Sequence, residues 1–410
     1  MGYAIKILNC NQGCTSCYVS KLQDKFKDYD IKAIHKTLLK CLDENPSWNP
    51  PNIHGGEPLL IKIKDLELLF STVFSHIRND KPIERTSIQT NLLNLKPRHI
   101  ELFKKYNTNV GISLDADSAG RGYNPEPVLK NMDKLKIAEI EMSIISLIRK
   151  SCCDPDFTWE FIKRMNEKYG IIHFKTNTII DFFGNDQEPD IIDLSNFYIK
   201  MVDYVLGQKE VIVHPFNSTV DLLLGGDGQC GSTHCDPLHT IAEVPIFNDG
   251  SLGNCLKNYG TQGHLITRAN KHYPVREILF KIPQWSGGCL DCIYWHICRG
   301  GCPGASIDND WRNKTRFCEA LKVLFKTIYD KIKGMIPNAV MVPDIYPGRL
   351  KVKNSLQYIK GSTYSRNSKI NLKELEADNS VNDSGNHGDS YTDQHGDAPH
   401  GDHTDHAGKK

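Results

Sequence analysis

Three cysteines near the start of the chain have a spacing that could hold an iron–sulfur cluster. They lie in the segment Cys10-Asn11-Gln12-Gly13-Cys14-Thr15-Ser16-Cys17-Tyr18, a Cx3Cx2C pattern. Three thiolates hold three irons of a cubic cluster and leave the fourth open, whereas a closed electron carrier has four cysteines. A structural zinc site also needs four ligands, and an odd number of cysteines without a secretory signal disfavours disulfides. The spacing favours an open iron–sulfur cluster, with zinc or structural cysteines as alternatives.

A second group of eight cysteines falls within fewer than one hundred residues of the second half of the chain. Eight thiolates are enough for two four-cysteine clusters, and zinc is the alternative because thiolate sites accept either metal. The group joins distant segments, so metal loss should unfold this module. Its members are Cys230, Cys235, Cys255, Cys289, Cys292, Cys298, Cys302 and Cys318.

The remaining cysteines, Cys41, Cys152 and Cys153, fit no cluster pattern. We expect these three cysteines to be buried structural thiols, because free cysteine behaves as a small apolar residue.

Two short polar segments could approach a ligand of the open iron. In His54-Gly55-Gly56-Glu57-Pro58 the glycines allow close backbone approach, and the carboxylate can accept from an ammonium group. An ordinary strand-to-helix turn is the alternative. The segment Asn109–Asp115 predicts a strand that ends in small polar residues. Arg121 follows, and is as readily a solvated surface arginine.

Together these segments resemble the radical S-adenosylmethionine enzymes. In that family the open iron chelates the amino and carboxylate groups of S-adenosylmethionine. One electron from the reduced cluster then cleaves the sulfonium to a 5′-deoxyadenosyl radical, which abstracts a substrate hydrogen. The resemblance implies that the Gly-Gly-Glu-Pro segment receives the methionyl amino group, and that Ser113 meets the ribose or carboxylate. The implied cofactor-binding residues are Gly55, Gly56, Glu57, Ser113, Asp115 and Arg121.

The chain departs from the family pattern at two places. The family usually has an aromatic residue before the third cysteine, whereas Ser16 stands here and Tyr18 follows. The common Thr-Asn-Gly after the third strand is Thr90-Asn91-Leu92. Neither departure removes a cluster ligand, but both put the adenine and methionine contacts in doubt.

The second cysteine group resembles the SPASM extension of radical enzymes that modify peptides and proteins. The shared pattern is Cys235-x14-Gly250-x4-Cys255, followed by Cx2Cx5Cx3C and a last cysteine. The resemblance implies three 4Fe-4S clusters, S-adenosylmethionine, and a small electron donor such as flavodoxin or ferredoxin. It gives auxiliary cluster I the ligands Cys230, Cys235, Cys255 and Cys302. It gives auxiliary cluster II the ligands Cys289, Cys292, Cys298 and Cys318.

Strand-like and helical patterns alternate over the first half of the chain and predict an α/β fold. Six such units suit the family's partial (β/α)6 barrel, whose site faces the carboxyl ends of the strands. The strand candidates are Ala4–Leu8, Asn52–His54, Thr86–Thr90, Asn109–Leu114, Glu141–Leu147 and His173–Ile180. The helix candidates are Ile31–Leu42, Leu66–Ile77, Pro97–Tyr106, Pro125–Leu135 and Phe157–Tyr169.

The predicted organisation has three parts. Residues 1–210 are expected to form the barrel, and residues 211–335 a bridge and the cysteine-rich module. Residues 336–410 form an extension whose end, rich in His, Gly and Asp, should be disordered because it has few core-forming residues. Its histidines could bind a divalent metal weakly, with a solubilising tail as the alternative.

Composition excludes several classes of function. The net charge of +1 gives no electrostatic case for nucleic acid or an anionic membrane. The sequence has no apolar run long enough to span a bilayer and no charged-then-apolar leader. Fourteen cysteines without such a leader indicate a reducing, cytoplasmic compartment.

The leading hypothesis is a radical enzyme that oxidatively modifies a peptide or protein substrate, most plausibly a maturase of a ribosomally made peptide. Only nine residues precede Cys10, so an N-terminal leader-binding domain is not expected. Leader recognition, if it is required, is expected from a separate leader-binding protein or from the barrel and the cysteine-rich module. An anaerobic sulfatase-maturase is the enzymatic alternative, although Leu256 stands where that group has its presumed base. A non-catalytic iron–sulfur or zinc scaffold is the alternative from another class.

Overall fold

All the elements described below belong to the first of two units into which the chain divides, Met1–Ser368 and Lys369–Lys410. The computed structural model describes residues 2–15, 17–19, 28–44, 49–78, 81–117, 124–181, 184–224, 244–253, 255, 257, 289, 292–307, 313–335, 339–342 and 349–352.

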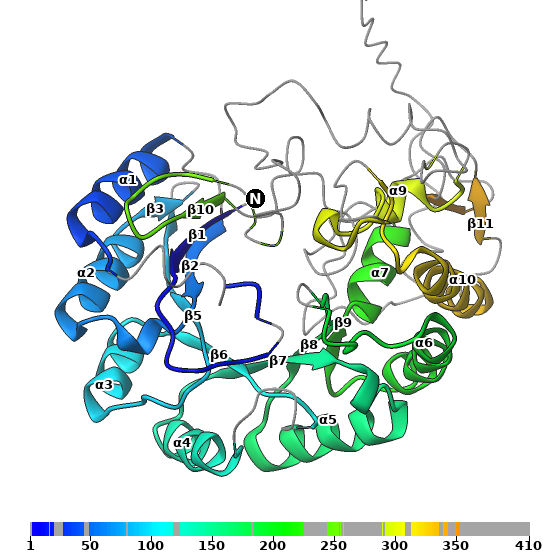
Figure 1. Ribbon diagram of the computed structural model, residues 1–410, viewed down its shortest axis with the longest axis horizontal. Helices are drawn as coiled ribbons and strands as arrows, with labels where there is room; N and C mark the ends of the chain where they lie inside the picture. Colours follow the sequence, from blue (N-terminus) through cyan, green and yellow to red (C-terminus); the bar gives the residue numbers. More distant parts are fainter. Residues whose placement is uncertain are drawn as a thin grey trace, which may run out of the picture. The chain divides into compact units, whose positions relative to one another are not determined.

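An eight-stranded parallel sheet organises this unit, in the order β10-β1-β2-β5-β6-β7-β8-β9. Figure 1 shows the strands lining the inside of an open ring of helices. The α/β partial barrel predicted from the alternating pattern is therefore confirmed. The strands are β1 (Gly2–Ile7), β2 (Asn49–Gly55), β5 (Ser87–Thr90), β6 (Asn109–Ser113), β7 (Met142–Ile148), β8 (His173–Thr178), β9 (Ile212–His214) and β10 (Val244–Ile246).

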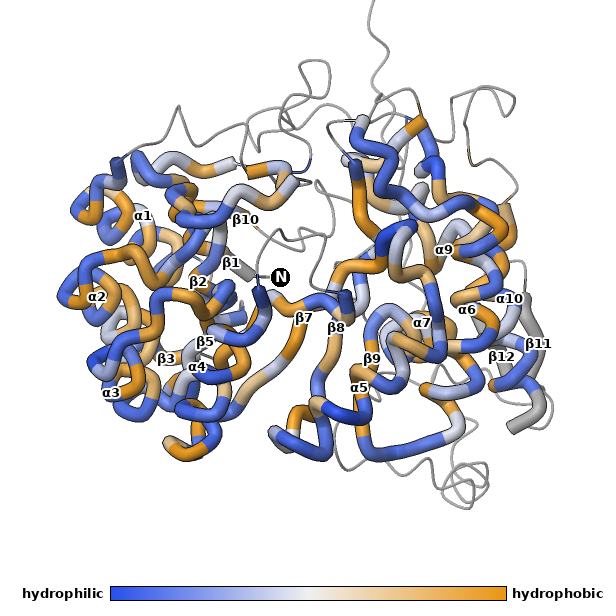
Figure 2. The backbone as a smooth tube through the Cα atoms, turned by 60° about the horizontal axis from the view of Figure 1, so that its bottom comes forward, coloured by the Kyte–Doolittle hydropathy of each residue, from blue (hydrophilic) through white to orange (hydrophobic). Residues whose placement is uncertain are grey.

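Helices cover the outer face of the sheet, because each carries one apolar stripe (Figure 1). In α2 the buried residues include Leu66, Leu69, Phe70 and Val73, the spacing of one helical face. Polar and apolar residues alternate along these outer helices in Figure 2. The helices are α1 (Ile31–Glu44), α2 (Ile63–Phe74), α3 (Pro97–Lys105), α4 (Glu126–Ile137), α5 (Pro155–Tyr169) and α6 (Ile191–Leu206).

Local signals set the helix ends. Helix α5 begins where Asp154 accepts a hydrogen bond from the Phe157 N–H, with Pro155 in the first turn. It ends at Gly170, whose φ of 68° is readily adopted by a residue without a Cβ atom. Because these signals can be recognised in the sequence, the predicted end of the helix agrees with the observed end, and the predicted start lies within a few residues of the observed start.

The strands present apolar side chains to the helices and more polar ones to the inside. Along β8 the exposure alternates, with Phe174 and Thr176 buried and His173 and Lys175 half-buried. Strand β7 alternates in the same way. Because successive side chains of a strand point to opposite faces, this pattern leaves a partly polar inner surface that can line a site.

The sheet also extends beyond the six predicted units. Strand β9 pairs with β8, and β10 pairs with β1 at the opposite edge. Both strands follow residue 210, the predicted end of the barrel, so the barrel sheet draws on residues assigned to the bridge. The domain boundaries at 210 and 335 stay a prediction.

The last described helices pack beside the β8–β9 end of the sheet. Helix α10 (Cys318–Met335) contacts α6 and α7 (Phe216–Leu223), and the short α9 (Trp295–Cys298) also lies against α7. Two antiparallel strand pairs lie outside the main sheet: β3 (Ile77–Arg78) with β4 (Lys81–Pro82), and β11 (Ala339–Val342) with β12 (Arg349–Val352). Across the described residues, no helix has the length and apolar character needed to cross a membrane.

A cysteine-lined cavity as the candidate active site

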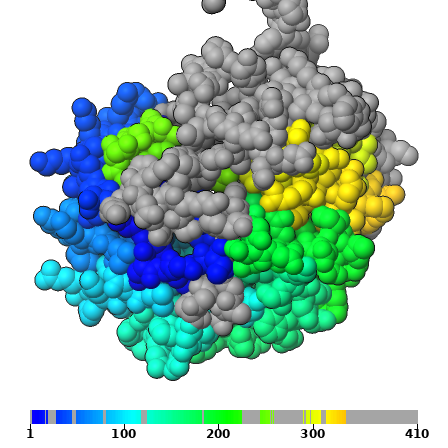
Figure 3. Space-filling view, viewed as in Figure 1, coloured from blue at the N-terminus to red at the C-terminus, as the bar shows by residue number. Residues whose placement is uncertain are grey.

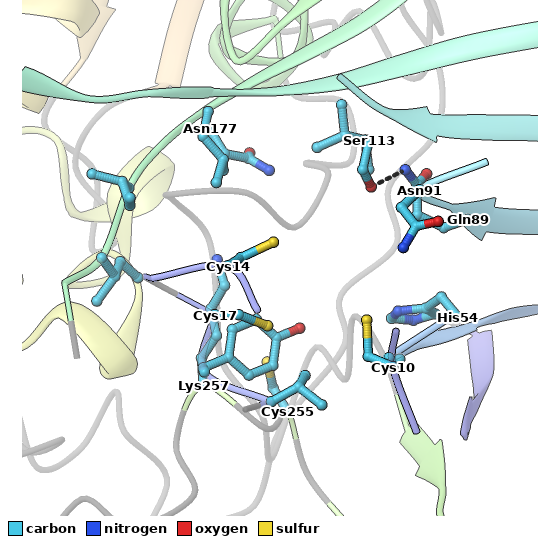
Figure 4. Close-up of a pocket in the computed structure, with 18 of the residues that line it drawn as sticks. Cys10, Cys14, Cys17, His54, Gln89, Asn91, Ser113, Asn177, Cys255 and Lys257 are labelled. Carbon is cyan, nitrogen blue, oxygen red and sulfur yellow. Dashed lines mark hydrogen bonds between the residues drawn. The ribbon is translucent and has the colours of Figure 1, made fainter. Parts of the chain in front are cut away.

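A cavity of about 310 Å³ lies against the inner face of the sheet and collects cysteines from distant parts of the chain. Cys10, Cys14 and Cys17 line it, and so do Cys255 and Cys302. Figure 4 shows the cysteines that it labels on one side of the cavity, with polar residues across from them. The labelled cysteines are Cys10, Cys14, Cys17 and Cys255, and the polar residues are Gln89, Asn91, Ser113 and Asn177. In Figure 3 the N-terminal segment lies between the early βα units and the green region around β8 and α6.

The two glycines of the Gly55-Gly56-Glu57 segment hold the base of the cysteine loop. The Gly56 N–H donates to the Ile7 carbonyl at 2.7 Å, and the Glu57 N–H donates to the Asn9 carbonyl at 2.7 Å. A Cβ atom on Gly56 would lie 2.2 Å from the Asn9 carbonyl oxygen. Only glycine permits this approach, which fixes the backbone directly before Cys10.

The carboxylate of Glu57 is fully buried and accepts three hydrogen bonds from protein groups. They come from Leu59 N–H (2.9 Å), Thr90 Oγ1 (2.6 Å) and Asn91 N–H (2.7 Å). Burial raises the pKa of Glu57, against the lowering effect of these donors. The side chain therefore ties the end of β2 to the end of β5. Gly55 and Gly56 line the cavity.

Two further residues that sequence reasoning missed support the cysteine loop. Asn248, which follows β10, accepts from Leu8 N–H at 2.9 Å and donates to Asn9 Oδ1 at 3.1 Å. Gln187 donates from Nε2 to Thr15 Oγ1 at 2.8 Å. Neither residue belongs to a recognisable motif, because each acts through a fold contact distant in sequence.

Ser113, which the resemblance assigns to the cofactor, lines the cavity. Its hydroxyl accepts from Gln89 Nε2 at 2.9 Å, the dashed line in Figure 4. Asn91 lies beside it and donates to Asn11 Oδ1 in the cysteine loop at 3.0 Å. The ends of β5 and β6 therefore present hydroxyl and amide groups to the same space as the thiols.

Asp115 does not line the cavity; its buried carboxylate is used by the fold. It accepts from Leu147 N–H at 2.8 Å and forms an ion pair with Arg149 at 2.5 Å. Arg149 in turn is buried, lines the cavity, and has an Nε without a hydrogen-bond partner. The arginine that faces the site thus follows β7, whereas the predicted Arg121 lies outside the described residues.

Leu92 stands where the family has the glycine of Thr-Asn-Gly, and it adopts a backbone conformation that glycine prefers. Its φ of 62° lies in the left-handed region that glycine prefers, while its side chain is fully buried. The Leu92 N–H donates to Thr90 Oγ1 at 2.8 Å, and its carbonyl accepts from Asn131 at 2.8 Å. These bonds hold a strained backbone directly after Asn91.

A second, smaller cavity is lined by Cys289, Cys292, Cys298 and Cys318, the four residues predicted to hold auxiliary cluster II. Burial is the largest cause that raises the pKa of Cys289 to about 12 and that of Cys298 well above its usual value, and the neighbouring thiols contribute to both shifts. Such a group of buried thiols needs positive charge to become thiolates, which metal or iron–sulfur binding supplies. The donor set fits a four-cysteine site.

Within the described ranges, no three Cys, His, Asp or Glu side chains converge as a single metal ion requires.

Cys255 and Cys302, two predicted ligands of auxiliary cluster I, come together at the main cavity. Burial is the largest cause that raises the pKa of Cys302; Cys255 raises it further and Lys257 lowers it. The other predicted ligands, Cys230 and Cys235, lie outside the described residues, as do most of the extension after residue 335 and its whole tail. Of the three other cysteines, Cys41 and Cys152 are buried and Cys153 is half-buried, broadly as expected.

The family model for the radical SAM superfamily matches residues 5–151. Residues 5–151 therefore match the radical S-adenosylmethionine enzymes. This match spans the cysteine loop and the strands up to β7, and it confirms the family predicted from the sequence. S-adenosylmethionine and a 4Fe-4S cluster are the cofactors of this chemistry.

The enzyme also resembles individual proteins over most of its length. It is 22% identical over 363 residues to a cysteine-type anaerobic sulfatase-maturating enzyme of Clostridium novyi (strain NT), covering 79% of this chain and 93% of the relative. The solved structure of anSMEcpe with bound AdoMet and Kp18Cys peptide has a TM-score of 0.64 at 17% identity, covering 82% and 99%. Streptococcus suis SuiB bound to S-adenosylmethionine has a TM-score of 0.52 at 18% identity, covering 77% and 76%.

At these identities the solved structures establish the fold alone. Their coverage extends past the barrel into the cysteine-rich region, so the relatives share the architecture of both parts.

Proposed function

We propose that the enzyme uses a 5′-deoxyadenosyl radical to oxidise a residue of a peptide or protein substrate. The observation that carries the proposal is the shared cavity of Cys10, Cys14, Cys17, Cys255 and Cys302. In this cavity the three-cysteine loop lies beside two cysteines of the second group. This arrangement suits a radical reaction in which the substrate then passes an electron to a second cluster.

Cys10, Cys14 and Cys17 are proposed to hold the 4Fe-4S cluster that binds S-adenosylmethionine. When bound, the reduced cluster supplies the electron that cleaves the sulfonium. The residues of the chain hold the loop in place: Gly56 and Glu57 through β1, Asn248 from β10, and Gln187 through Thr15.

Ser113 and Arg149 are proposed to orient the methionyl carboxylate. Both line the cavity, and the Arg149 guanidinium is fixed by its ion pair with Asp115. A guanidinium matches a carboxylate in geometry and stays charged when buried. The buried Nε without a partner is a donor that a ligand would satisfy.

The second cysteine group is proposed to hold two auxiliary 4Fe-4S clusters with the predicted ligands. Cys289, Cys292, Cys298 and Cys318 meet at one cavity, and Cys255 meets Cys302. A cluster at Cys255 and Cys302 would lie at the wall of the main cavity, well placed to accept an electron from the substrate. A flavodoxin or ferredoxin would supply the reducing electron.

A peptide substrate is proposed because solved structures with the same fold contain a bound peptide. The solved structures include anSMEcpe with a bound peptide and SuiB bound to the precursor peptide SuiA. The shared fold makes the same class of substrate reasonable here, with leader recognition by a separate protein or by this chain.

The decisive experiment compares the anaerobically reconstituted enzyme with a Cys10→Ala, Cys14→Ala, Cys17→Ala variant. We expect about twelve irons and 5′-deoxyadenosine formation for the wild type. The variant should keep the irons of the auxiliary sites and form no 5′-deoxyadenosine. Product formation by the variant, or tight zinc in place of iron and sulfide, would contradict the proposal. Mass spectrometry of a peptide encoded beside the gene, after co-expression, then tests the peptide step.

Formylglycine formation is the second candidate, favoured by the sulfatase-maturating relative of Clostridium novyi. Leu256 replaces the presumed base of that group directly after Cys255. Incubation with a peptide that carries a sulfatase Cys motif distinguishes the candidates: an aldehyde product supports this second function, and an unreacted peptide supports the first.

A further inference from the structure

Lys257 lies on the wall of the main cavity near two cysteines of the second group. It follows Cys255 by two residues, and Cys255, Lys257 and Cys302 all line the cavity. Figure 4 shows Lys257 on the same side of the cavity as Cys17 and Cys255. A positive charge is therefore part of the wall at which an auxiliary cluster is proposed to lie.

Packing against the segment that follows Cys302 holds the backbone of Lys257 in place. A Cβ atom on Gly304 would lie 2.7 Å from the Lys257 carbonyl oxygen and 2.9 Å from the Lys257 Cβ atom. Only a glycine at position 304 permits this approach. The segment that carries Cys255 and Lys257 thus packs directly on the segment that carries Cys302, which fixes where the Lys257 side chain begins relative to that thiol.

The charge of Lys257 acts on the Cys302 thiol. Burial is the largest cause that raises the pKa of Cys302, and Lys257 is the largest cause that lowers it. The N–H groups of Gly304 and Ala305 contribute in the same direction as Lys257. Among the described residues, the groups that shift this pKa include no acidic side chain, and no Asp or Glu lines the cavity. Negative charge on the Cys302 sulfur is therefore stabilised chiefly by Lys257.

The second cysteine cavity has a different balance of charge. Lys314 and Lys322 lower the pKa of Cys318, whereas Glu319 raises it. Glu319 also accepts a hydrogen bond from the Lys322 ammonium at 3.1 Å. In the part of the chain that the structure describes, a carboxylate thus accompanies the lysines at the second cavity, and none lines the first.

We propose that the Lys257 ammonium raises the reduction potential of the auxiliary cluster at Cys255 and Cys302. An iron–sulfur cluster gains negative charge on reduction, so a nearby cation stabilises its reduced form. This inference rests on the proposed function, because it concerns the step after hydrogen abstraction. In that step the substrate radical gives one electron to the oxidised cluster and one proton to water. A small electron carrier of the flavodoxin or ferredoxin class, in its oxidised form, then takes up the electron.

The test is a potentiometric titration of the Cys10→Ala, Cys14→Ala, Cys17→Ala protein, followed by electron paramagnetic resonance. This protein lacks the ligands of the S-adenosylmethionine cluster, so the two auxiliary clusters give the reduction steps. We expect Lys257→Gln, added to this protein, to lower the midpoint potential of one step and to leave the other where it was. The equilibrium constant for that reduction should fall about tenfold, which is about 59 mV for one electron. Lys257→Arg keeps the charge and should preserve both potentials.

Two matched substitutions assign the reduction steps. Lys322→Gln removes a cation from the lining of the second cysteine cavity, so it should lower the step that Lys257→Gln leaves unchanged. Lys130→Gln should move neither step, because Lys130 is exposed on α4 in an ion pair with Glu126. Lys257→Met, which is also neutral, gives a second measurement if Lys257→Gln does not hold its clusters.

Iron and sulfide analysis separates the possible failures. If both auxiliary clusters are present and Lys257→Gln moves neither potential, the inference is wrong. An equal shift of both steps would overturn it as well, because it would report a general rearrangement. A shift confined to the S-adenosylmethionine cluster of the otherwise wild-type enzyme would assign Lys257 to that cluster instead. Zinc in place of the auxiliary clusters would contradict the proposed function itself.

Discussion

The charged side chains near the cavity are of two kinds. Some are paired with other protein groups, and others line the cavity. Glu57 and Asp115 both stand in segments that resemble cofactor motifs, yet each carboxylate is occupied by backbone N–H groups or by Arg149. Lys175 and Arg149 stand in no motif and face the cavity. At this site the motif residues shape the backbone, and side chains from later strands supply much of the positive charge.

The role proposed for Arg149 is tested by Arg149→Lys. This change keeps a positive charge beside Asp115 but removes the planar pair of donors that a carboxylate accepts. We expect the dissociation constant for S-adenosylmethionine to rise about tenfold, with the iron content unchanged. Equilibrium dialysis of the cluster-loaded enzyme against labelled S-adenosylmethionine measures it.

Arg164→Lys is the control for this substitution. Arg164 is exposed on α5, so its replacement should leave the dissociation constant where it is in the wild type. An unchanged affinity in Arg149→Lys would show that the methionyl carboxylate is held by other groups.

The loop between β8 and α6 connects the two cysteine groups. Gln187 donates to Thr15 in the cysteine loop, and its carbonyl accepts from Lys150 N–H at 2.9 Å. The next residue, Glu188, pairs with Arg316, two positions before Cys318, with an Nε to Oε2 distance of 2.7 Å. A loop that the sequence analysis placed in the barrel, without a role at either site, therefore joins the two cysteine groups through side-chain contacts.

Gln187→Ala should loosen the cysteine loop without touching a ligand. A side-chain hydrogen bond contributes about 1 kcal/mol, so we expect the rate of 5′-deoxyadenosine formation to fall about threefold. Thr15→Val removes the same bond from the other side. The double variant should therefore be about as slow as either single variant, a non-additive result. Independent, multiplying effects would mean that the two side chains act separately.

The long elements could be predicted because their periodicity is local. The predicted helix of residues 157–169 and strand of residues 141–147 match α5 and β7 to within two residues. The three-residue strands β9 and β10 could not be predicted, because such short segments have no periodicity of their own. Val244-Pro245-Ile246, for example, becomes a strand only by pairing with β1. Arg149 was missed for the same reason, since its importance depends on where the end of β7 lies. The ligand assignments from cysteine spacing stay predictions, although the described thiols gather as those assignments require.

At the scale of the molecule, the cysteine-rich segment and the barrel sheet share a core. Ile297 and Cys298 of α9 and Leu321, Leu324 and Phe325 of α10 are buried in the same hydrophobic cluster as the barrel residues. Helix α10 packs on α6 and α7 beside β9. A cluster held by Cys298 and its neighbours would therefore be packed against the β9 edge of the sheet through α9 and α10.

Cys298→Ala tests this connection together with the cluster assignment. Cys298 is buried among Cys289, Cys292 and Cys318, so loss of its thiolate should remove the cluster and about four irons. Because the proposed cluster would join residues 289–298 to the start of α10, its loss should free α10 from α6 and raise the rate of proteolysis there. Cys41→Ala is the control: this thiol is also buried, in α1, and its loss should leave the iron content unchanged. If Cys298→Ala kept the full iron and the protease resistance of the wild type, Cys298 would be a structural thiol and the second cluster would need other ligands.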